Sequence, residues 1–425
     1  MKHNYILILI VTCCYSLISN AQWEYWEQVF EVTDNNFYNL YTPDNQTVWI
    51  AGEQGKVYQS QDGGQNFTTT SLETFGFMAA FDFPSSGVGY IGGGCYFTFD
   101  ECPSNTIYRS TDGGQTWSQI LGSTVGFGVI EQIKAVSNDI IYAKSDYEGI
   151  LKTTNGGATW QTLTIPDIDL VSVSYRNMEF LTEQLGFLYV LGYQPGFQGV
   201  QRIYKTTDGG QSWQVVYNKP TSEGGFADFY FTSQNTGYIA ASEGRVLKTT
   251  NGGQTWETIN FGVTDDEPRD IFFVTPDVGY LAAKNTVSGT SRIYKTEDAG
   301  TSWFLDLEIN DLSIQKLHFS DTENGYAMFD FRKVYRRTGT ATPTNNSLDL
   351  LLFPNPVVNT FTVELDFIPS EDYVLNLYDG QGRVVKSTQR VFEPVDIEGF
   401  ATGVYMVEVV KEDGTLVGRG KVVKR

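Results

Sequence analysis

The sequence contains little histidine. Of its 425 residues only two are histidines, and His3 falls in the N-terminal segment discussed below. That leaves His318, in the strand-like stretch KLHFS. Metal clusters built on several histidines, and most Ser–His–Asp schemes, are therefore poorly supported. We expect no catalytic residues, no bound metal and no cofactor, and we expect His318 to be packed or partly exposed on a strand.

Positive charge and long apolar runs are also scarce. The 29 lysines and arginines are outnumbered by 50 aspartates and glutamates, which gives a formal net charge of −21. Nucleic-acid binding needs clustered basic residues, so a nucleic-acid partner is excluded. Past the N-terminus no stretch approaches the ~20 apolar residues that a membrane-spanning helix needs. We therefore expect no transmembrane segment.

The N-terminus has the pattern of a secretory signal. Lys2 precedes the apolar stretch YILILIVTCCYSLIS, and small residues follow at Ser19 and Ala21. This order predicts a signal peptide over residues 1–21 that is cleaved between Ala21 and Gln22. The alternative is a lipoprotein signal ending at Cys13 or Cys14, although Thr12 stands where a glycine or alanine is expected.

Cysteine is rare as well, with four residues in the chain. Removal of the signal leaves Cys95 and Cys102, in GGGCYFTFDECPS. A redox or metal pair is the weaker interpretation, because the spacing is not CxxC and there is no second pair. An exported chain meets an oxidising compartment, so we predict a disulfide that closes a local hairpin loop.

A short acidic turn recurs along the chain. Its Asp or Asn lies at positions spaced by 43 to 53 residues: Asp62, Asp112, Asn155, Asp208, Asn251 and Asp298. Each unit reads as four short strands: an apolar strand, a strand beginning with GY or GF, an alternating strand that enters the turn, and a strand that opens on an aromatic residue. This period in a strand-rich pattern predicts an all-β propeller.

The first three strands of the unit occur seven times, one more than the turn. The last copy, residues 317–338, ends before any turn or aromatic strand. YWEQVFEV at 25–32 resembles the missing fourth strand with nothing before it. We therefore predict a seven-bladed propeller over residues 22–338, closed by strand 25–32 pairing beside 333–337. Closure removes an open sheet edge.

The chemistry of the turn is that of a hydrogen-bonded corner. Asp and Asn offer a short acceptor to nearby backbone N–H groups, and consecutive glycines allow positive φ. A calcium loop needs several oxygen ligands close together, whereas each turn supplies one carboxylate. Asn155 and Asn251 keep the acceptor and lose the charge. We therefore interpret the six turns as structural.

The motif S/T-x-D/N-G-G-x-T-W resembles the Asp-box, or bacterial neuraminidase repeat. The seven-unit pattern over roughly residues 25–340 is most similar to the photosystem II assembly and stability factor group. This resemblance implies turns between the third and fourth strands, at the rim of the propeller and away from the usual active site. It implies no particular activity, since many relatives have none assigned.

The last eighty residues differ in composition. A Thr/Pro/Asn-rich linker at 339–347 precedes alternating strands with DGQG and EDGT turns, which predict a small Ig-like antiparallel β-sandwich over 348–425. The end is basic, with Arg419, Lys421, Lys424 and Arg425. Taken alone, these residues could belong to a solvated last strand.

This segment also resembles a known family. FPNPVVNTFTV, which contains Pro354, Asn355 and Pro356, together with LYDGQGRVV, GVYMVEV and the terminal GKVVKR, is similar to the type IX secretion C-terminal sorting domain (type A) of Bacteroidota. The resemblance implies engagement of the type IX machinery by the domain, including its final Lys424–Arg425. It also implies a chain that is secreted or attached to the cell surface.

Two enzyme classes deserve comparison with a binding role. Sialidases also carry Asp-boxes, but they need an Arg-Ile-Pro element that this chain lacks. Xyloglucan-type glycosidases need two catalytic carboxylates in a cleft between two propellers, and only one propeller is predicted here. The acidic stretch with Asp265, Asp266 and Glu267 is expected to be solvated. A secreted glycosidase remains the alternative to a non-catalytic binding or scaffold module for a protein or glycan.

Propellers bind ligands at the mouth of the central channel, where the first strands of the blades begin. Alignment of these strands predicts a mouth lined by one residue from each blade: Phe37, Ala79, Glu131, Arg176, Ala227, Arg269 and Gln315. Glu131, Arg176, Arg269 and Gln315 would give it mixed charge. The plainer interpretation is a water-lined channel.

Overall fold

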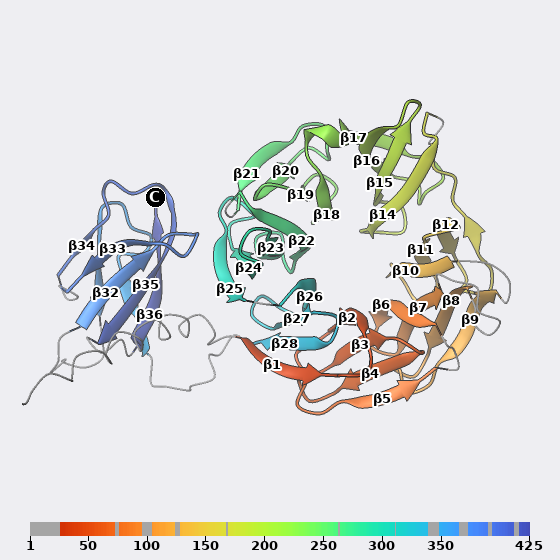
Figure 1. The fold of residues 1–425 in the computed structure, drawn as a ribbon, viewed down its shortest axis with the longest axis horizontal. Coiled ribbons are helices and arrows are strands. Elements are labelled where there is room, and N and C mark those ends of the chain that lie inside the picture. The colour runs from red at the N-terminus through yellow and green to blue at the C-terminus, as the bar shows by residue number, and fades with distance from the viewer. Residues whose placement is uncertain are drawn as a thin grey trace, which may run out of the picture. The chain divides into compact units, whose positions relative to one another are not determined.

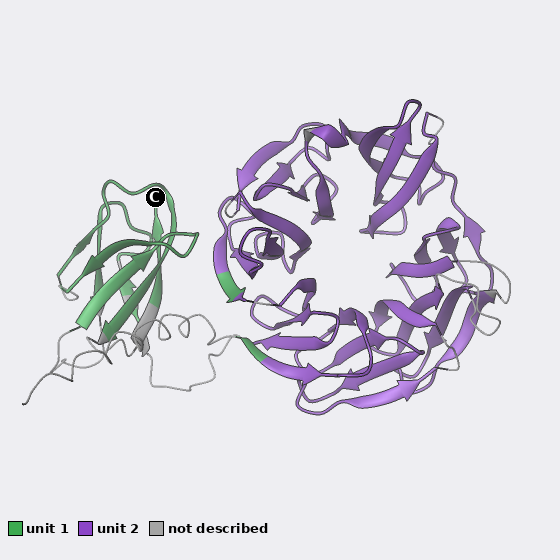
Figure 2. Ribbon diagram, viewed as in Figure 1, with its two compact units in different colours: residues 1–27, 306–308, 340–425 green, residues 28–305, 309–339 purple. Residues whose placement is uncertain are grey.

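The computed structural model describes most of the chain as β-structure (Figure 1). The described residues are 26–72, 76–95, 104–123, 128–166, 169–261, 264–310, 312–338, 348–364, 373–389, 393–411 and 416–425. Two compact units are present (Figure 2), the larger comprising Gln28–Leu305 and Ile309–Gly339, and the smaller including Thr340–Arg425. No helix in the described residues is long and apolar enough to cross a membrane.

The larger unit is a ring of seven blades of four antiparallel strands, and the second and third blades are joined into one eight-stranded sheet. Blade 1 contains β2 (Phe37–Tyr41), β3 (Val48–Gly52), β4 (Lys56–Ser60) and β5 (Thr68–Ser71). Blade 2 contains β6 (Phe77–Ser85), β7 (Val88–Cys95), β8 (Ser104–Ser110) and β9 (Ser118–Ser123). Blade 3 contains β10 (Gly128–Ala135), β11 (Ile141–Ser145), β12 (Gly149–Thr153) and β13 (Gln161–Thr162). Blade 4 contains β14 (Ser172–Phe180), β15 (Gly186–Gln194), β16 (Gln198–Thr206) and β17 (Gln214–Pro220).

The ring continues through three more blades. Blade 5 contains β18 (Phe226–Phe231), β19 (Gly237–Ala241), β20 (Arg245–Thr249) and β21 (Glu257–Asn260). Blade 6 contains β22 (Asp266–Phe273), β23 (Gly279–Asn285), β24 (Ser291–Thr296) and β25 (Phe304–Ile309). Blade 7 contains β26 (Ile314–Phe319), β27 (Gly325–Phe329) and β28 (Lys333–Arg337), with β1 (Trp26–Glu31) as its fourth strand. In each of the first six blades, the strand that comes first in the sequence faces the centre of the ring (Figure 1). In blade 7 the strand that faces the centre is β26. The predicted fold class, a seven-bladed propeller followed by a sandwich, is confirmed.

The two ends of the propeller sequence meet in blade 7. β1 pairs with β28, and just beyond β1 the backbone N–H of Val32 donates to the carbonyl of Arg332 at 3.1 Å. Blade 7 is then tied to blade 1 by Arg336, whose Nη1 donates to the carbonyl of Gly63 at 2.6 Å. The closure therefore combines strand pairing with contacts between the two terminal blades. Trp26 also donates from Nε1 to Asp306 at 2.7 Å.

The contact between neighbouring blades is built from a repeated aromatic group. Tyr142 of blade 3 stacks on Phe180 of blade 4 with ring centroids 3.4 Å apart, and Trp213 of blade 4 approaches Phe180 edge-on. Tyr238, Phe273 and Trp303 repeat this arrangement between blades 5 and 6. The ring of Phe231, which ends the inner strand of blade 5, is accommodated by the glycine before Tyr238, because a Cβ on Gly237 would lie 2.4 Å from that ring. The recurring GY pair is therefore a packing requirement.

The smaller unit is a sandwich of two sheets. One sheet has the order β29 (Leu348–Asp349), β36 (Leu416–Lys424), β35 (Gly403–Lys411), β32 (Tyr373–Tyr378) and β33 (Val384–Thr388). The other contains β30 (Leu351–Phe353), β31 (Thr360–Glu364) and β34 (Val395–Asp396). Its core includes Leu375, Val407 and Val422, none of which is exposed.

The predicted sorting motif joins the beginning of the sandwich to its end. Asn355 donates from Nδ2 to the carbonyl of Lys421 at 2.6 Å and accepts from the N–H of Val423 at 2.9 Å. Lys424 is buried, whereas Pro354, Pro356 and Arg425 are exposed. The basic end is therefore an interior strand of the sheet rather than a freely solvated one.

Candidate functional site

The inner strand of every blade carries a β-bulge at the same place. The strand pairing skips one residue in each: Tyr38, Ala79, Glu131, Arg176, Ala227, Arg269 and Gln315. Bulges re-aim side chains and recur beside functional sites. All seven residues are half-buried or exposed. Six of them are the predicted mouth residues, and we call this set the mouth ring.

In blade 1 the sequence alignment was wrong by one residue. Phe37 is fully buried and stacks on Phe30, with ring centroids 5.6 Å apart. Tyr38 is the bulged residue, and its hydroxyl donates to Glu53 at 2.9 Å. Two successive aromatic residues follow two asparagines here, so the sequence alone did not distinguish the core position from the bulge.

The charges in the mouth ring are used unequally. Glu131 forms an ion pair with Lys144, and Gln315 Oε1 accepts a hydrogen bond from the N–H of Phe331 at 3.3 Å. Arg176 and Arg269 are exposed and form no ion pair with another described residue. The mouth therefore presents two available guanidinium groups, although the chain as a whole is strongly acidic.

A cavity of about 400 Å³ opens beside Arg176, between blades 4 and 5. Tyr189, Gln201 and Phe226 form part of its wall. Gln201 is held in place because its Oε1 accepts from the N–H of Phe226 at 3.1 Å and its Nε2 donates to Gly224 at 2.6 Å. Burial raises the pKa of Tyr189 to about 12, so its phenol is neutral. The cavity thus combines a cation with neutral polar and aromatic surface.

Exposed apolar side chains gather on the same face. They lie on the hairpins that join the second and third strands, beside the bulged ends of the inner strands: Tyr147, Tyr193, Phe197, Val287 and Phe331. Phe197 is 85% exposed and Tyr147 is 71% exposed. Val171, which precedes β14 and bonds Tyr193 through its N–H, joins them. Among the large apolar residues that are exposed in the described part of the propeller, only Val215 lies elsewhere, on an outer strand.

Below the mouth the channel holds charged residues that the sequence analysis missed. Asp270 accepts from Lys316 Nζ at 2.8 Å and from the N–H of Leu317 in blade 7 at 2.7 Å. Asp228 accepts from the N–H of Ile271 in blade 6 at 3.2 Å. Each carboxylate therefore fastens its blade to the next. Asp228 and Asp270 each directly follow the bulged residue of their inner strand, so inspection of that position in the aligned strands would have found them.

Burial and neighbouring charges shift the pKa values of Asp228 and Lys316. Burial and the charge of Asp270 raise the pKa of Asp228 to about 7. Although burial alone would lower the pKa of Lys316, the charges of Asp270 and Asp228 raise it. Both aspartates thus have an oxygen engaged by the neighbouring blade, which ties the blades together.

His318 lies further along the same strand. It packs between the rings of Tyr41 and Phe272, at 4.7 and 4.9 Å, and its Nδ1 accepts from the N–H of Thr42 at 3.3 Å. Burial, followed by the charges of Lys316 and Lys134, lowers its pKa to about 3. His318 is thus a neutral packing residue, as the sequence suggested.

The acidic stretch at 265–267 is only partly solvated, which corrects the expectation from sequence. Asp265 is exposed and Glu267 half-buried, but Asp266 is fully buried and bonds Arg292 at 2.7 Å and Asn285 at 2.8 Å. It also accepts from the hydroxyl of Tyr294 at 2.5 Å. In the described residues, no group of three or more His, Cys, Asp or Glu side chains is arranged to hold a metal ion.

The six turns share one hydrogen-bond pattern. In the first copy Ser60 donates to Asp62 Oδ1 at 2.8 Å and accepts from the N–H of Gly64 at 2.8 Å. Asp62 Oδ1 also accepts from the N–H of Asn66 at 2.9 Å. The same bonds recur around the other five turn residues, which are Asp112, Asn155, Asp208, Asn251 and Asp298.

Asp and Asn are interchangeable because the last bond of the turn can reverse. Ser212 donates its hydroxyl to Asp208 Oδ2, whereas Asn155 donates from Nδ2 to the hydroxyl of Thr159 at 2.9 Å. Substitution of Asp208 by Asn should therefore leave the melting temperature nearly unchanged at neutral pH, while Ala should lower it by roughly 2 °C. Thermal melting by circular dichroism tests this.

Low pH should distinguish the stability of a protein with Asp in these turns from that of a variant with Asn. The bond from Ser212 and other turn contacts lower the pKa of Asp208 to about 2, from an ordinary 3.8, and Asp112 behaves alike through Thr116. Because the folded-state pKa is depressed, this stabilisation is complete above pH ~4 and disappears as the pH falls towards ~2. The Asp112→Asn, Asp208→Asn double variant should lose less stability than wild type across that window. An equal loss would contradict this account of the turn.

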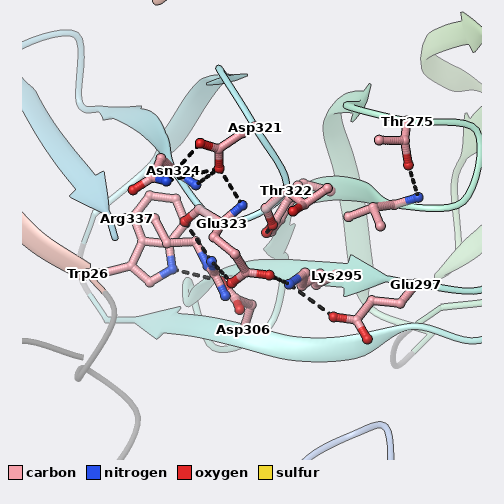
Figure 3. Close-up of polar contacts among 12 residues, drawn as sticks. Trp26, Thr275, Lys295, Glu297, Asp306, Asp321, Thr322, Glu323, Asn324 and Arg337 are labelled. Carbon is pink, nitrogen blue, oxygen red and sulfur yellow. Dashed lines mark hydrogen bonds and ion pairs between the residues drawn. The ribbon is translucent and has the colours of Figure 1, made fainter. Parts of the chain in front are cut away.

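The turns also take part in the contacts between blades. Lys152 of blade 3 donates to the carbonyl of Gly209 in the turn of blade 4 at 2.8 Å, and Lys248 of blade 5 donates to Ala299 in the turn of blade 6 at 2.7 Å. Blade 7 has no turn of this kind. There Lys295 of blade 6 bonds Glu323 at 2.7 Å, and Arg337 bonds the other oxygen of Glu323 at 2.9 Å (Figure 3). An ion-pair network therefore replaces the missing turn.

Comparison with known proteins agrees with this architecture. The family model described as photosynthesis system II assembly factor YCF48 matches residues 18–179 and 167–324, which is more than half of the chain. The chain belongs to the YCF48 family. A model described as secretion system C-terminal sorting domain matches residues 351–424. The chain is thus an exported member of the YCF48 family that is secreted or attached to the cell surface.

Relatives cover only part of this chain. The photosystem II assembly lipoprotein Ycf48 of Synechococcus sp. (strain CC9902) is 26% identical over 33% of this chain and 38% of its own length. A xyloglucanase of Paenibacillus sp is 25% identical over 31% of this chain, and the match spans 15% of the xyloglucanase. Among solved structures, YCF48 bound to D1 peptide has a TM-score of 0.56 at 19% identity, covering 74% of this chain and 94% of that one.

Proposed function

We propose that the exported propeller is a non-catalytic docking module that holds a peptide segment of a partner protein on its mouth face. One observation carries the proposal: the available Arg176 and Arg269, the cavity beside Arg176 and nearly all exposed apolar side chains of the propeller occur on one face. Exposed apolar patches bounded by polar residues are typical of protein-binding surfaces.

The chemistry of the face describes the segment that it would take. Two guanidinium groups that have no ion-pair partner among the described residues favour carboxylates, which they bind through paired hydrogen bonds. The apolar hairpin tips, led by Phe197 and Tyr147, favour apolar side chains on either side. An extended segment that alternates acidic and apolar residues would satisfy both. The solved structure of YCF48 bound to D1 peptide supports a peptide ligand for this fold.

A display library of random linear peptides, panned on the full exported chain, tests this proposal. We expect enrichment of segments with Asp or Glu beside apolar residues. Replacement of both Arg176 and Arg269 by Ala should weaken such peptides at least about tenfold, since a charged hydrogen bond contributes about 1.5–3 kcal/mol. The matched control is Arg383→Ala, an arginine of the sandwich whose side chain is 72% exposed. Enrichment that survives the double substitution would reject the mouth.

The sandwich is proposed to engage the type IX secretion machinery, since it matches a sorting-domain model. Glycoside hydrolysis is the second candidate function, because part of the chain is similar to a xyloglucanase. Release of reducing ends from a panel of polysaccharides would favour it, provided that substitution of one carboxylate abolished the release. The engagement of Asp228 and Asp270 in contacts between blades argues against those two residues as the catalytic pair.

A further inference from the structure

A second cavity, of about 380 Å³, opens at the end of the inner strands opposite the mouth. Its wall comes from blades 3 to 6, three to five residues past the bulge in blades 3 to 5 and four to seven residues past it in blade 6. Its polar side chains are those of Lys134, Glu179, Tyr230, Thr232 and Thr275. An aliphatic rim is formed by Val136, Leu181 and Val274, each of which directly follows the last residue of an inner strand.

The charges of this cavity cancel. Lys134 Nζ lies 3.0 Å from Glu179, and these are the only charged residues in its described lining. The charge of Glu179 raises the pKa of Lys134, so Lys134 stays protonated. Burial raises the pKa of Tyr230, so its phenol remains a neutral donor. The two charged side chains of the wall therefore compensate each other.

The cavity nevertheless offers donors and acceptors side by side. Lys134 and Tyr230 donate and Glu179 accepts. Thr232, also in the lining, has a hydroxyl that is buried without a hydrogen-bond partner among the described residues. A pair of adjacent hydroxyls can bridge Lys134 and Glu179 without separating them, because each hydroxyl both donates and accepts. A zwitterion would have to split the ion pair.

We infer that this cavity is a binding site for a neutral hydroxylated ligand, namely a terminal sugar residue of a glycan. The aliphatic rim would contact the C–H face of the ring, and its hydroxyls would bond Lys134, Glu179 and Tyr230. A volume of about 380 Å³ is within the usual range of small-ligand sites. Export brings the chain to where glycans are encountered. The site is separate from the peptide face proposed above.

Saturation-transfer NMR on the full exported chain tests the inference. The probes are methyl glycosides of glucose, galactose, mannose, fucose and N-acetylglucosamine, with free leucine and acetate as zwitterionic and anionic comparisons. At about 10 mM, which would saturate a site with a Kd of about 1 mM, at least one glycoside should bind and neither comparison compound should. Absence of glycoside binding, or preference for leucine or acetate, would overturn the inference.

Variants of the cavity wall test whether the glycoside binds in this cavity. Tyr230→Phe and Glu179→Gln should each weaken the glycoside about tenfold. Val136→Trp should block the cavity while leaving the Lys134–Glu179 pair intact, so it serves if Glu179→Gln fails to fold. The Arg176→Ala, Arg269→Ala double variant should bind the glycoside as wild type does. Binding that survives Val136→Trp and Tyr230→Phe in folded protein would place the sugar elsewhere, and would leave the peptide face untouched.

Discussion

Substitution of Glu323 by Ala should destabilise the propeller by about 2–3 kcal/mol. Glu323 neutralises both Lys295 and Arg337, whose side chains are only 10% and 4% exposed. Removal of the carboxylate takes one counter-charge from each of two buried cations, and removing one partner of a buried pair is the costly way to break it, although Lys295 keeps Glu297 at 3.0 Å. The figure is below that of a fully buried pair because Glu323 itself is 43% exposed. Urea denaturation followed by tryptophan fluorescence measures it.

Glu297→Ala provides the matched control. Glu297 also contacts Lys295, at 3.0 Å, but its removal leaves the shorter Lys295–Glu323 pair and the Arg337–Glu323 pair in place. Its loss should therefore cost less than about 1 kcal/mol, as exposed pairs do. Similar losses for the two glutamate variants would show that Glu323 does not replace the missing turn of blade 7.

Substitution of Phe30 by Ala should destabilise the protein by about 2–3 kcal/mol. Phe30 lies on β1, which completes blade 7, and its ring stacks on Phe67 with centroids 4.1 Å apart and contacts Tyr58 at 5.4 Å. Both of these partners belong to the blade 1 region. The lost contacts would thus weaken the closure of the ring as well as the local core.

Proteolysis distinguishes closure from general destabilisation. Limited digestion should cleave Phe30→Ala first near the junction of blades 7 and 1. Phe361→Ala, which affects a fully buried residue of the sandwich, should leave that junction protected. Cleavage of Phe30→Ala at sites spread evenly around the ring would contradict a specific role in closure.

The ring could be predicted from sequence because its parts are local and repeated. A turn that recurs every 43 to 53 residues revealed the repeat, the strand pattern with its GY pair indicated seven blades, and the strand without a partner at 25–32 indicated how blade 7 is completed. The bulge in each inner strand places the mouth ring, and the alignment found six of its seven members without revealing the bulge itself. Tyr38 was missed because Phe37 beside it has similar chemistry.

The cavities and the channel required three dimensions. Lys134 and Glu179 are 45 residues apart and meet only because neighbouring inner strands converge on one axis. The role of Glu323 was hidden for a similar reason, since its partners lie on two different blades. The predicted signal peptide with cleavage after Ala21, the alternative lipidation site, the 339–347 linker and Cys102 lie outside the described residues, so the disulfide between Cys95 and Cys102 stays a prediction.

Photo-cross-linking in cells of the native host tests the mouth face most directly. A photoreactive phenylalanine analogue at Phe197 or Ala227 samples that face, and the same analogue at Val215 samples an outer strand that is 41% exposed. The account predicts a discrete protein adduct from Phe197 and Ala227, lost when Arg176 and Arg269 are replaced by Ala, and none from Val215. An adduct from Val215 alone, or one that is indifferent to the two arginines, would contradict it.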